Sequence, residues 1–356
     1  MRRDLRKEFH AQRSTPGAQP RQRGAALLAA MITVALVATL AAAALWRQWR
    51  GVEVESAERA RVQSSWILTG ALDWGRLILA GDQRESSIDH LAEPWAVPLA
   101  EARLSTFLSA GESSTDTDRD AFLSGQITDL QSRLNVMNLV LTDKPGNDPA
   151  NPSSSPSPNP NPPKSAYSRF LRLFGALGLR TSELDTLTVN LTRAYTAMQS
   201  NTVAAGDAPL LPRRFEQLAW LGVSPETLQA LRPYVTVLPI SGNPTPVNLN
   251  TASALVIYAA LPDDIDLAGA QRLVAQRDRS PFQGMKDVKD ALASLGTTLS
   301  SLADQWIDVK SSFFEIRGRL RLDDVALEEV AVVRRLDNRR GVITLWRERA
   351  ALTAGP

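Results

Sequence analysis

The sequence predicts an α+β protein in which a long N-terminal transmembrane helix packs on a small antiparallel sheet, with a large all-helical domain inserted into that sheet. Three observations predict this fold. An uncharged apolar run occupies residues 25–46, strand-like alternation occurs near residues 125–135 and again after residue 300, and a helical pattern fills residues 166–300. Because each strand group needs the other to form a sheet of useful size, the helical segment between them is expected to be an insertion.

Residues 1–24 form a cationic leader. They hold seven Lys and Arg side chains and two acidic ones, Asp4 and Glu8, which gives a net charge of +5. Because the whole chain has a net charge of +2, the remaining residues have a net charge of −3. The basic charge is concentrated at one end and is poor support for nucleic-acid binding by the body. The leader carries more positive charge than the far end of the apolar run, at Arg47 and Arg50. This asymmetry favours a cytoplasmic N-terminus with the body across the membrane.

The apolar run at residues 25–46 is long enough to cross a membrane. Twenty of its 22 residues are hydrophobic and none is charged, and about 20 apolar helical residues span the ~30 Å hydrocarbon core. Three interpretations are open: a secretory signal cut within Ala41–Ala44, an uncut signal anchor, or a helix retained after cleavage at Gly24. The run exceeds the roughly 7–15 apolar residues of an ordinary signal peptide, which favours a retained helix.

Residues 47–80 are expected to continue the helix as its soluble half. Apolar and small residues recur there every three to four positions, from Ala57 through Leu68 to Ile78, as on the buried face of an amphipathic helix. One helix from Ala25 to about Ala80 would be roughly 80 Å long. A break into two helices near Gly51 is the alternative.

Residues 81–142 are expected to form the first part of the sheet. Pro94 and Pro98 suit an edge or an irregular ribbon, and Gly125–Asn135 alternates apolar with polar side chains as a half-buried strand does. Residues 143–165 are mostly Pro, Asn and Ser with almost nothing to bury. Such a composition is typical of a solvated linker.

Residues 166–300 show mainly helical periodicity. Ser224 before Pro225, and Asn250 before Thr251, are predicted helix caps. The predicted helices are Ser168–Leu179, Ser182–Gln199, Phe215–Leu221, Pro225–Leu231, Thr251–Ala260, Leu267–Arg277 and Met285–Leu295.

Residues 301–356 return to alternation and are expected to complete the sheet with antiparallel strands, with a turn at Asp337–Gly341. The predicted strands are Trp306–Val309, Phe313–Leu322, Leu327–Arg335 and Gly341–Glu348.

The chain is poorly equipped for catalysis. It has no cysteine and only two histidines, His10 and His90. This composition excludes disulfides, thiolate zinc sites and cysteine nucleophiles, and leaves little for Ser-His-Asp chemistry or transition-metal binding. We therefore expect no enzymatic activity and no cofactor, unless calcium is one.

One acidic segment has the spacing of a calcium loop. Asp116, Asp118 and Asp120 offer oxygen ligands at alternate positions, as the first half of such a loop does. The glycine and the distal carboxylate of an EF-hand are replaced by Ala121 and Ile127. A solvated acidic loop is the favoured interpretation, with calcium binding as the alternative.

The basic leader that ends in Gly24 directly before the apolar helix resembles a type IV prepilin leader. In that family the prepilin peptidase cuts after the glycine, and a residue without a Cβ lets a protease approach the backbone closely. Prepilins usually carry Glu at the fifth position of the mature chain, where this sequence has Ala29. The missing carboxylate argues against a major pilin and fits the one pseudopilin type that lacks it.

The segment Val247–Ser253, with the predicted helices around it, resembles a helix-hairpin-helix or SAM-like module. DNA-binding hairpins of this kind present backbone N–H groups to phosphate. Here the turn Leu261–Asp266 contains a proline and three aspartates, which remove a donor and repel phosphate. A protein–protein or purely structural role is therefore expected for this module, with no nucleic-acid partner.

Together these features resemble the minor pseudopilin K family of type II secretion systems. The leader ending at Gly24, the strand at Ile127, the linker-bounded helical block and the segment Asn248–Ala252 occur in the family's order. In the family, Ile-x-Asp-x-Gln is commonly followed by Gly-Arg-Phe-Asn-Leu-Asn. This chain departs from that pattern at Ser132, Leu134, Val136 and Met137.

The resemblance implies a non-enzymatic minor pseudopilin at the tip of the pseudopilus, together with the I-type and J-type minor pseudopilins and the major pseudopilin. It implies a part in starting assembly and in exporting folded proteins across the outer membrane. The protein would cross the Gram-negative inner membrane once, with a cytoplasmic N-terminus and a periplasmic body. Prepilin peptidase would cut after Gly24 and Ala25 would be N-methylated; some members bind calcium. The alternative is a membrane-anchored DNA-uptake or competence pilin-like protein that uses the hairpin module.

Overall fold

A computed structural model describes residues 23–103, 121–141, 164–200, 208–297, 304–322, 325–336 and 341–351. Two compact units divide the chain between residues 63 and 64. Within the described residues, the first unit consists of the N-terminal part of helix α1 (Arg23–Glu85). The second unit holds the last turns of α1, the sheet and the helical block.

In the second unit, one face of α1 is buried. The buried residues recur every three or four positions and are Ser64, Leu68, Leu72, Gly75 and Leu79. This spacing places them on one side of a helix with 3.6 residues per turn. The predicted helix is confirmed and extends five residues beyond the expected Ala80.

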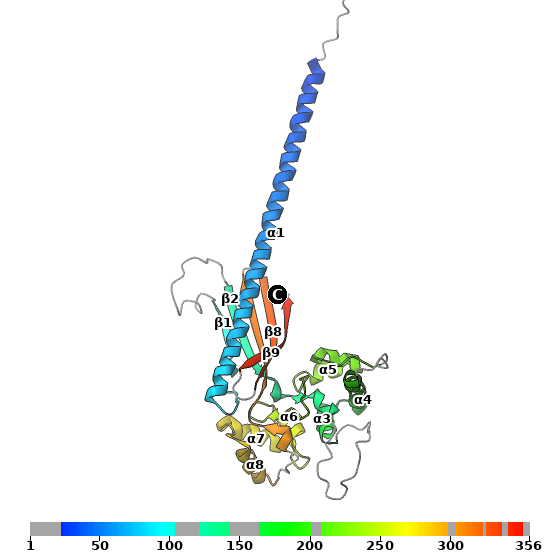
Figure 1. Cartoon of the computed structure of the whole chain (residues 1–356), viewed down its shortest axis with the longest axis vertical. Coiled ribbons are helices and arrows are strands. Elements are labelled where there is room, and N and C mark those ends of the chain that lie inside the picture. Colours follow the sequence, from blue (N-terminus) through cyan, green and yellow to red (C-terminus); the bar gives the residue numbers. More distant parts are fainter. Residues whose placement is uncertain are drawn as a thin grey trace, which may run out of the picture. The chain divides into compact units, whose positions relative to one another are not determined.

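The main sheet has five antiparallel strands in the order β1-β2-β7-β8-β9 (Figure 1). The strands are β1 (Leu99–Arg103), β2 (Ala121–Asp129), β7 (Phe313–Leu322), β8 (Val325–Arg335) and β9 (Val342–Ala351). The predicted strand at Phe313–Leu322 is confirmed at both ends. Strands β2 and β7 are neighbours, with Ile127 opposite Ile316, so everything between them in the chain is an insertion into the sheet, as expected.

The prediction of one strand from Gly125 to Asn135 is wrong in its second half. Strand β2 ends at Asp129, whose carboxylate accepts a hydrogen bond from the Gln131 N–H at 2.7 Å. That bond caps the 3-10 helix η2 (Leu130–Ser132), which follows the strand directly. The two-residue strand β3 (Leu134–Asn135) and the 3-10 helix η3 (Val136–Val140) come next. The apolar–polar alternation continues through this turn because its apolar side chains are buried: Leu134 lies in the core of the helical block, and Leu130 packs with Leu238, Phe313 and Val332.

The predicted sheet strand Trp306–Val309 is also wrong. Asp304–Trp306 is a 3-10 helix, η6, and the short strand β6 (Ile307–Asp308) pairs in parallel with β5 (Val247–Asn248). A second two-residue parallel pair joins β3 to β4 (Val235–Thr236). Both pairs therefore link the helical insertion to segments that flank the main sheet.

The helical block has its own hydrophobic core, separate from that of the sheet. Its helices gather together in Figure 1. They are α3 (Lys164–Leu177), α4 (Thr181–Ser200), η5 (Phe215–Leu221), α5 (Pro225–Leu231), α6 (Ala254–Ala260), α7 (Leu267–Arg279) and α8 (Met285–Ser294). Every predicted helix is present, although the one at Phe215–Leu221 is a 3-10 helix.

The predicted caps have different outcomes. Ser224 caps α5 as expected, accepting a hydrogen bond from the Thr227 N–H, with Pro225 at the first helical position. The prediction that Asn250 caps a helix from Thr251 is wrong, because α6 begins only at Ala254 and Ser253 is its cap. Asn250 is engaged elsewhere, as described below.

The core under the sheet lies between α1, the 3-10 helix η1 (Pro94–Ala96) and the inner faces of β2, β7 and β8. Trp95 meets Phe314 edge to face, with ring centroids 5.2 Å apart, a preferred arrangement of aromatic rings. Gly75 allows α1 to approach β7 closely, since a Cβ there would lie 2.9 Å from a methyl group of Ile316.

Candidate functional site: the apolar helix and the polar junction of the body

The N-terminal part of α1 exposes an apolar surface that no described residue covers. Within the described residues this is the one helix long and apolar enough to cross a membrane. Its large apolar side chains from Leu27 to Leu40 are all more than half exposed. The hydroxyls of Thr33 and Thr39 donate to helix carbonyls at 2.8 and 2.9 Å, so their polarity is satisfied without water. These features suit a segment in a bilayer.

Gly24 and Ala25 lie in the first turn of α1. A Cβ added to Gly24 would meet nothing within 4 Å, so the position is open to an approaching chain. Residues 1–22 lie outside the described residues. Cleavage after Gly24 and methylation of Ala25 remain predictions.

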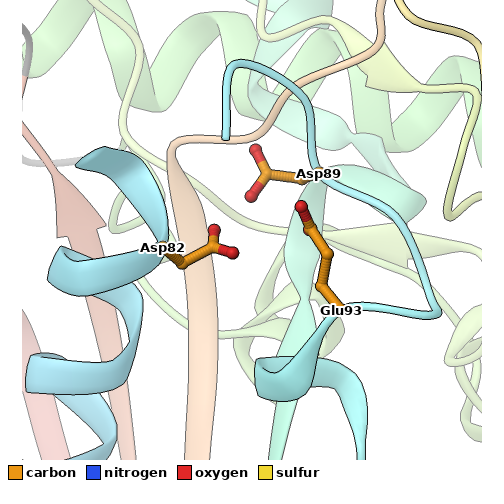
Figure 2. Close-up of side chains that lie close together, drawn as sticks. All are labelled: Asp82, Asp89 and Glu93. Atoms are coloured by element: carbon orange, nitrogen blue, oxygen red, sulfur yellow. The ribbon is translucent and has the colours of Figure 1, made fainter. Parts of the chain in front are cut away.

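Asp116, Asp118 and Asp120, the predicted calcium ligands, lie outside the described residues. The described residues contain a different acidic group. The carboxylates of Asp82, Asp89 and Glu93 point toward one another in Figure 2, with one oxygen from each within 4.8 Å of the others. By geometry alone such a group could hold a cation.

An arginine supplies the counter-charge of this acidic group. Arg335 of β8 bonds Asp89 with one guanidinium nitrogen and Asp82 with the other, the latter at 2.5 Å. The Arg335 side chain is 5% exposed and its guanidinium stacks on Phe314, 4.4 Å from the ring centre. Glu93 accepts from the Trp95 indole N–H at 2.7 Å. Through Arg335, the group therefore fastens the end of α1 to the sheet.

Burial dominates the electrostatics of this group. It raises the pKa of Asp82 to about 6, and Arg335 opposes that rise. Burial also raises the pKa of Asp89, again against the attraction of Arg335. For both carboxylates, the free energy lost on leaving water is larger than the free energy gained from the single guanidinium group.

A second polar cluster joins the sheet to the helical block and is built on Asp129. One oxygen of its carboxylate accepts hydrogen bonds from the hydroxyls of Thr251 and Ser311 and from the Asn248 amide. Burial raises the pKa of Asp129 to about 6, and the two hydroxyl bonds lower it. The Ser311 N–H in turn donates to Asp89 at 2.7 Å. The two clusters thus form one network.

Several motif residues singled out in the sequence belong to this network or lie beside it. Gln131 accepts from the Ser312 N–H at 2.6 Å and donates to the Pro246 carbonyl at 3.0 Å. Asn250 pairs with the backbone of Phe282 through both its oxygen and its nitrogen, at 2.9 and 3.0 Å. The Asp-x-Gln and Asn-x-Asn-Thr-Ala patterns therefore hold the insertion in place.

Sequence reasoning missed Asp82, Asp89 and Glu93. Their partner Arg335 stands 246 positions after Asp89, so no local spacing could reveal the group. Two buried asparagines were also missed. Asn135 bonds the Leu238 backbone in both directions, and Asn138 does the same with Thr245.

The hairpin turn between α6 and α7 has the character expected from its sequence. Asp266 caps α7 by accepting from the Gly269 N–H at 2.7 Å. Arg172 donates to the Leu261 and Ile265 carbonyls of the same turn and lies 3.5 Å from Asp263. The turn presents carboxylates and occupied carbonyls, which do not attract phosphate.

Comparison with known proteins gives consistent matches. Residues 132–240 and 247–310 match two family models, both described as type II secretion system protein K. Three relatives bear that name. The one from Pseudomonas aeruginosa is 25% identical over 85% of this chain and 86% of its own length. The one from Pectobacterium carotovorum is 25% identical over 85% and 90%, and the one from Klebsiella pneumoniae 26% identical over 83% and 86%.

A solved structure shares the fold. A chain in the crystal structure of the GspK–GspI–GspJ complex from enterotoxigenic Escherichia coli aligns with a TM-score of 0.56 at 16% identity, covering 83% of this chain and 99% of that one. The relatives match over most of their length, and the two family models cover the residues that build the insertion and its junction. The chain belongs to the type II secretion system protein K family.

Proposed function

We propose that this chain is a minor pseudopilin at the tip of the type II secretion pseudopilus, where it helps to start assembly and to export folded proteins across the outer membrane. The observation that carries the proposal is the uncovered apolar helix that continues without a break into the body of a family member. An apolar helix of this kind can pack among similar helices in a filament as well as in lipid.

The partners we propose are other pseudopilins. A chain of similar fold was crystallised in a complex named GspK–GspI–GspJ, which supports minor pseudopilins of the I and J types as neighbours of this body. The major pseudopilin and the prepilin peptidase complete the proposed set. A bulky insertion on the body would obstruct a subunit stacked above it, which favours the tip position.

We place the protein in the inner membrane with one pass, a cytoplasmic N-terminus and a periplasmic body. The family membership and the apolar helix support the anchoring, and the charge asymmetry across residues 25–46 supports the orientation. In this proposal prepilin peptidase cuts after Gly24 and the new terminus at Ala25 is methylated.

We propose that the helical insertion is a SAM-like protein–protein module with no catalytic role. The buried polar side chains described above act in holding the fold. The competing function, DNA uptake through the hairpin, is disfavoured by the acidic turn between α6 and α7.

Intact-mass analysis of the membrane-extracted protein tests the proposal. A mass that begins at Ala25 with one added methyl group is expected. A mass that begins within Ala41–Leu45 would contradict it and indicate ordinary secretion. Duplex DNA binding by the full chain in detergent, measured across salt, tests the alternative, because phosphate contacts require a steep salt dependence.

A further inference from the structure

A cleft of about 610 Å³ opens on the face of the sheet opposite α1, between strands β7 to β9 and the η5–β4 part of the helical block. Its charged lining consists of five arginines and three glutamates, a net charge of +2. Phe215, Trp346 and several valines line the rest. The cleft is therefore both cationic and partly apolar.

Each glutamate of the cleft already has an arginine partner. Glu348 lies 2.6 Å from Arg214, and Glu216 lies 2.9 Å from Arg232. Glu315 lies 2.9 Å from Arg317. Arg133 and Arg213 are the two lining arginines left over, and within the described residues neither guanidinium makes an ion pair or a hydrogen bond.

Arg133 is the more informative of the two. Its side chain is only partly exposed, and burial lowers the pKa of its guanidinium, an effect that Arg232 and Arg317 reinforce and Glu315 opposes. A partly buried cation without a direct carboxylate partner is costly unless an anion joins it. By contrast, the buried Arg335 described above forms ion pairs with two carboxylates.

We propose that this cleft binds an acidic segment of another protein chain, whose carboxylates pair with Arg133 and Arg213. Arginine and tryptophan, which both line the cleft, are enriched in protein–protein hot spots, and a guanidinium group can bind a carboxylate through two parallel hydrogen bonds. The volume of about 610 Å³ is larger than a single small anion needs and suits a peptide segment. This inference does not depend on the position of the subunit in a filament.

The first test measures binding of an acetylated, amidated hexaglutamate peptide to the full chain in detergent by calorimetry. We expect binding that weakens as salt rises, and a loss of about tenfold in affinity in Arg133→Gln and in Arg213→Gln. Arg84→Gln removes the same charge from the exposed last turn of α1 and should bind like the wild type. Equal losses in all three variants, or no binding, would overturn the proposal.

Folding of the variants is checked directly. Because the Arg133 side chain has no partner among the described residues to leave behind, Arg133→Gln should melt at the same temperature as the wild type or above it. A strongly lowered melting temperature would mean that Arg133 serves the fold, and would also overturn the proposal.

The second test identifies the occupant in cells. A photo-crosslinking amino acid replaces Val237, an apolar residue that lines the cleft, and the crosslinked peptide is sequenced. We expect a segment rich in Asp and Glu whose crosslink disappears in Arg133→Gln. Crosslinks to a neutral or basic segment, or Arg133-dependent binding to phosphatidylglycerol vesicles in place of protein, would contradict the proposal. Neither test involves processing at Gly24, so the failure of one proposal is distinguishable from failure of the other.

Discussion

At the scale of single residues, stability of the body depends on how buried charges are neutralised. Arg335 faces Asp82 and Asp89 with side-chain exposures of 5%, 10% and 3%. Replacing Arg335 with Gln leaves two buried carboxylates without their cation. We expect the free energy of unfolding to fall by about 3–5 kcal/mol, the usual cost of breaking a buried pair from one side. Urea unfolding measures the loss, with Arg84→Gln as the control of equal charge change.

The raised pKa of Asp129 gives a second prediction at this scale. The folded-state pKa is about 6 against the ordinary aspartate value of 3.8, so the folded state holds the proton more tightly than the unfolded chain. The contribution of the protonated Asp129 carboxyl to the free energy of unfolding is fully present below pH 4 and is lost as the pH rises through 6. The stability of the wild type relative to Asp129→Asn should therefore increase by about 2 kcal/mol between pH 7 and pH 4. A difference that is flat with pH would refute the assignment.

At the scale of elements, the contact of α1 with β7 depends on a glycine. A Cβ at Gly75 would lie 2.9 Å from Ile316 Cγ2, whereas a Cβ at Gly70 on the same helix would meet nothing within 4 Å. Gly70→Ala should stabilise by up to about 1 kcal/mol through helix propensity. Gly75→Ala gains the same propensity but forces apart a β-branched contact, and we expect it to be about 1–3 kcal/mol less stable than Gly70→Ala in the same unfolding assay.

The elements also show what a sequence can predict. Helix α5 and strand β7 were placed at their observed ends because capping residues and alternation are local signals. The prediction made strand β2 too long, because Asp129, the residue that ends the strand, fits the polar position of the apolar–polar alternation. The buried polar network built on Asp89 and Asp129 could not be predicted, because its members come together only when β2 and β7 pair. Asn250 was mistaken for a cap because its true partner, Phe282, is 32 positions away.

At the scale of the whole molecule, the apolar part of α1 is expected to fix where the protein resides. Leu36 lies at the centre of residues 25–46, and an arginine at the middle of a membrane helix costs about 2.5–3.5 kcal/mol of insertion free energy. Leu36→Arg should therefore move a large share of the protein out of the pellet after an alkaline carbonate wash of membranes. The control variant Val52→Arg, which lies on the same helix beyond the apolar run, should remain in the membrane pellet as the wild type does. Retention of Leu36→Arg would argue against a membrane role for this segment.

The pairing of β2 with β7 has a consequence for how the newly made chain acquires its shape. A ribosome adds roughly 5–20 residues each second, and the partner of β2 is translated only after the entire helical insertion. Until then β2 carries an open row of backbone donors and acceptors, a surface prone to faulty pairing with other chains. Biogenesis should therefore be most vulnerable to aggregation, and most dependent on chaperones, in the interval between synthesis of Asp129 and synthesis of Leu322.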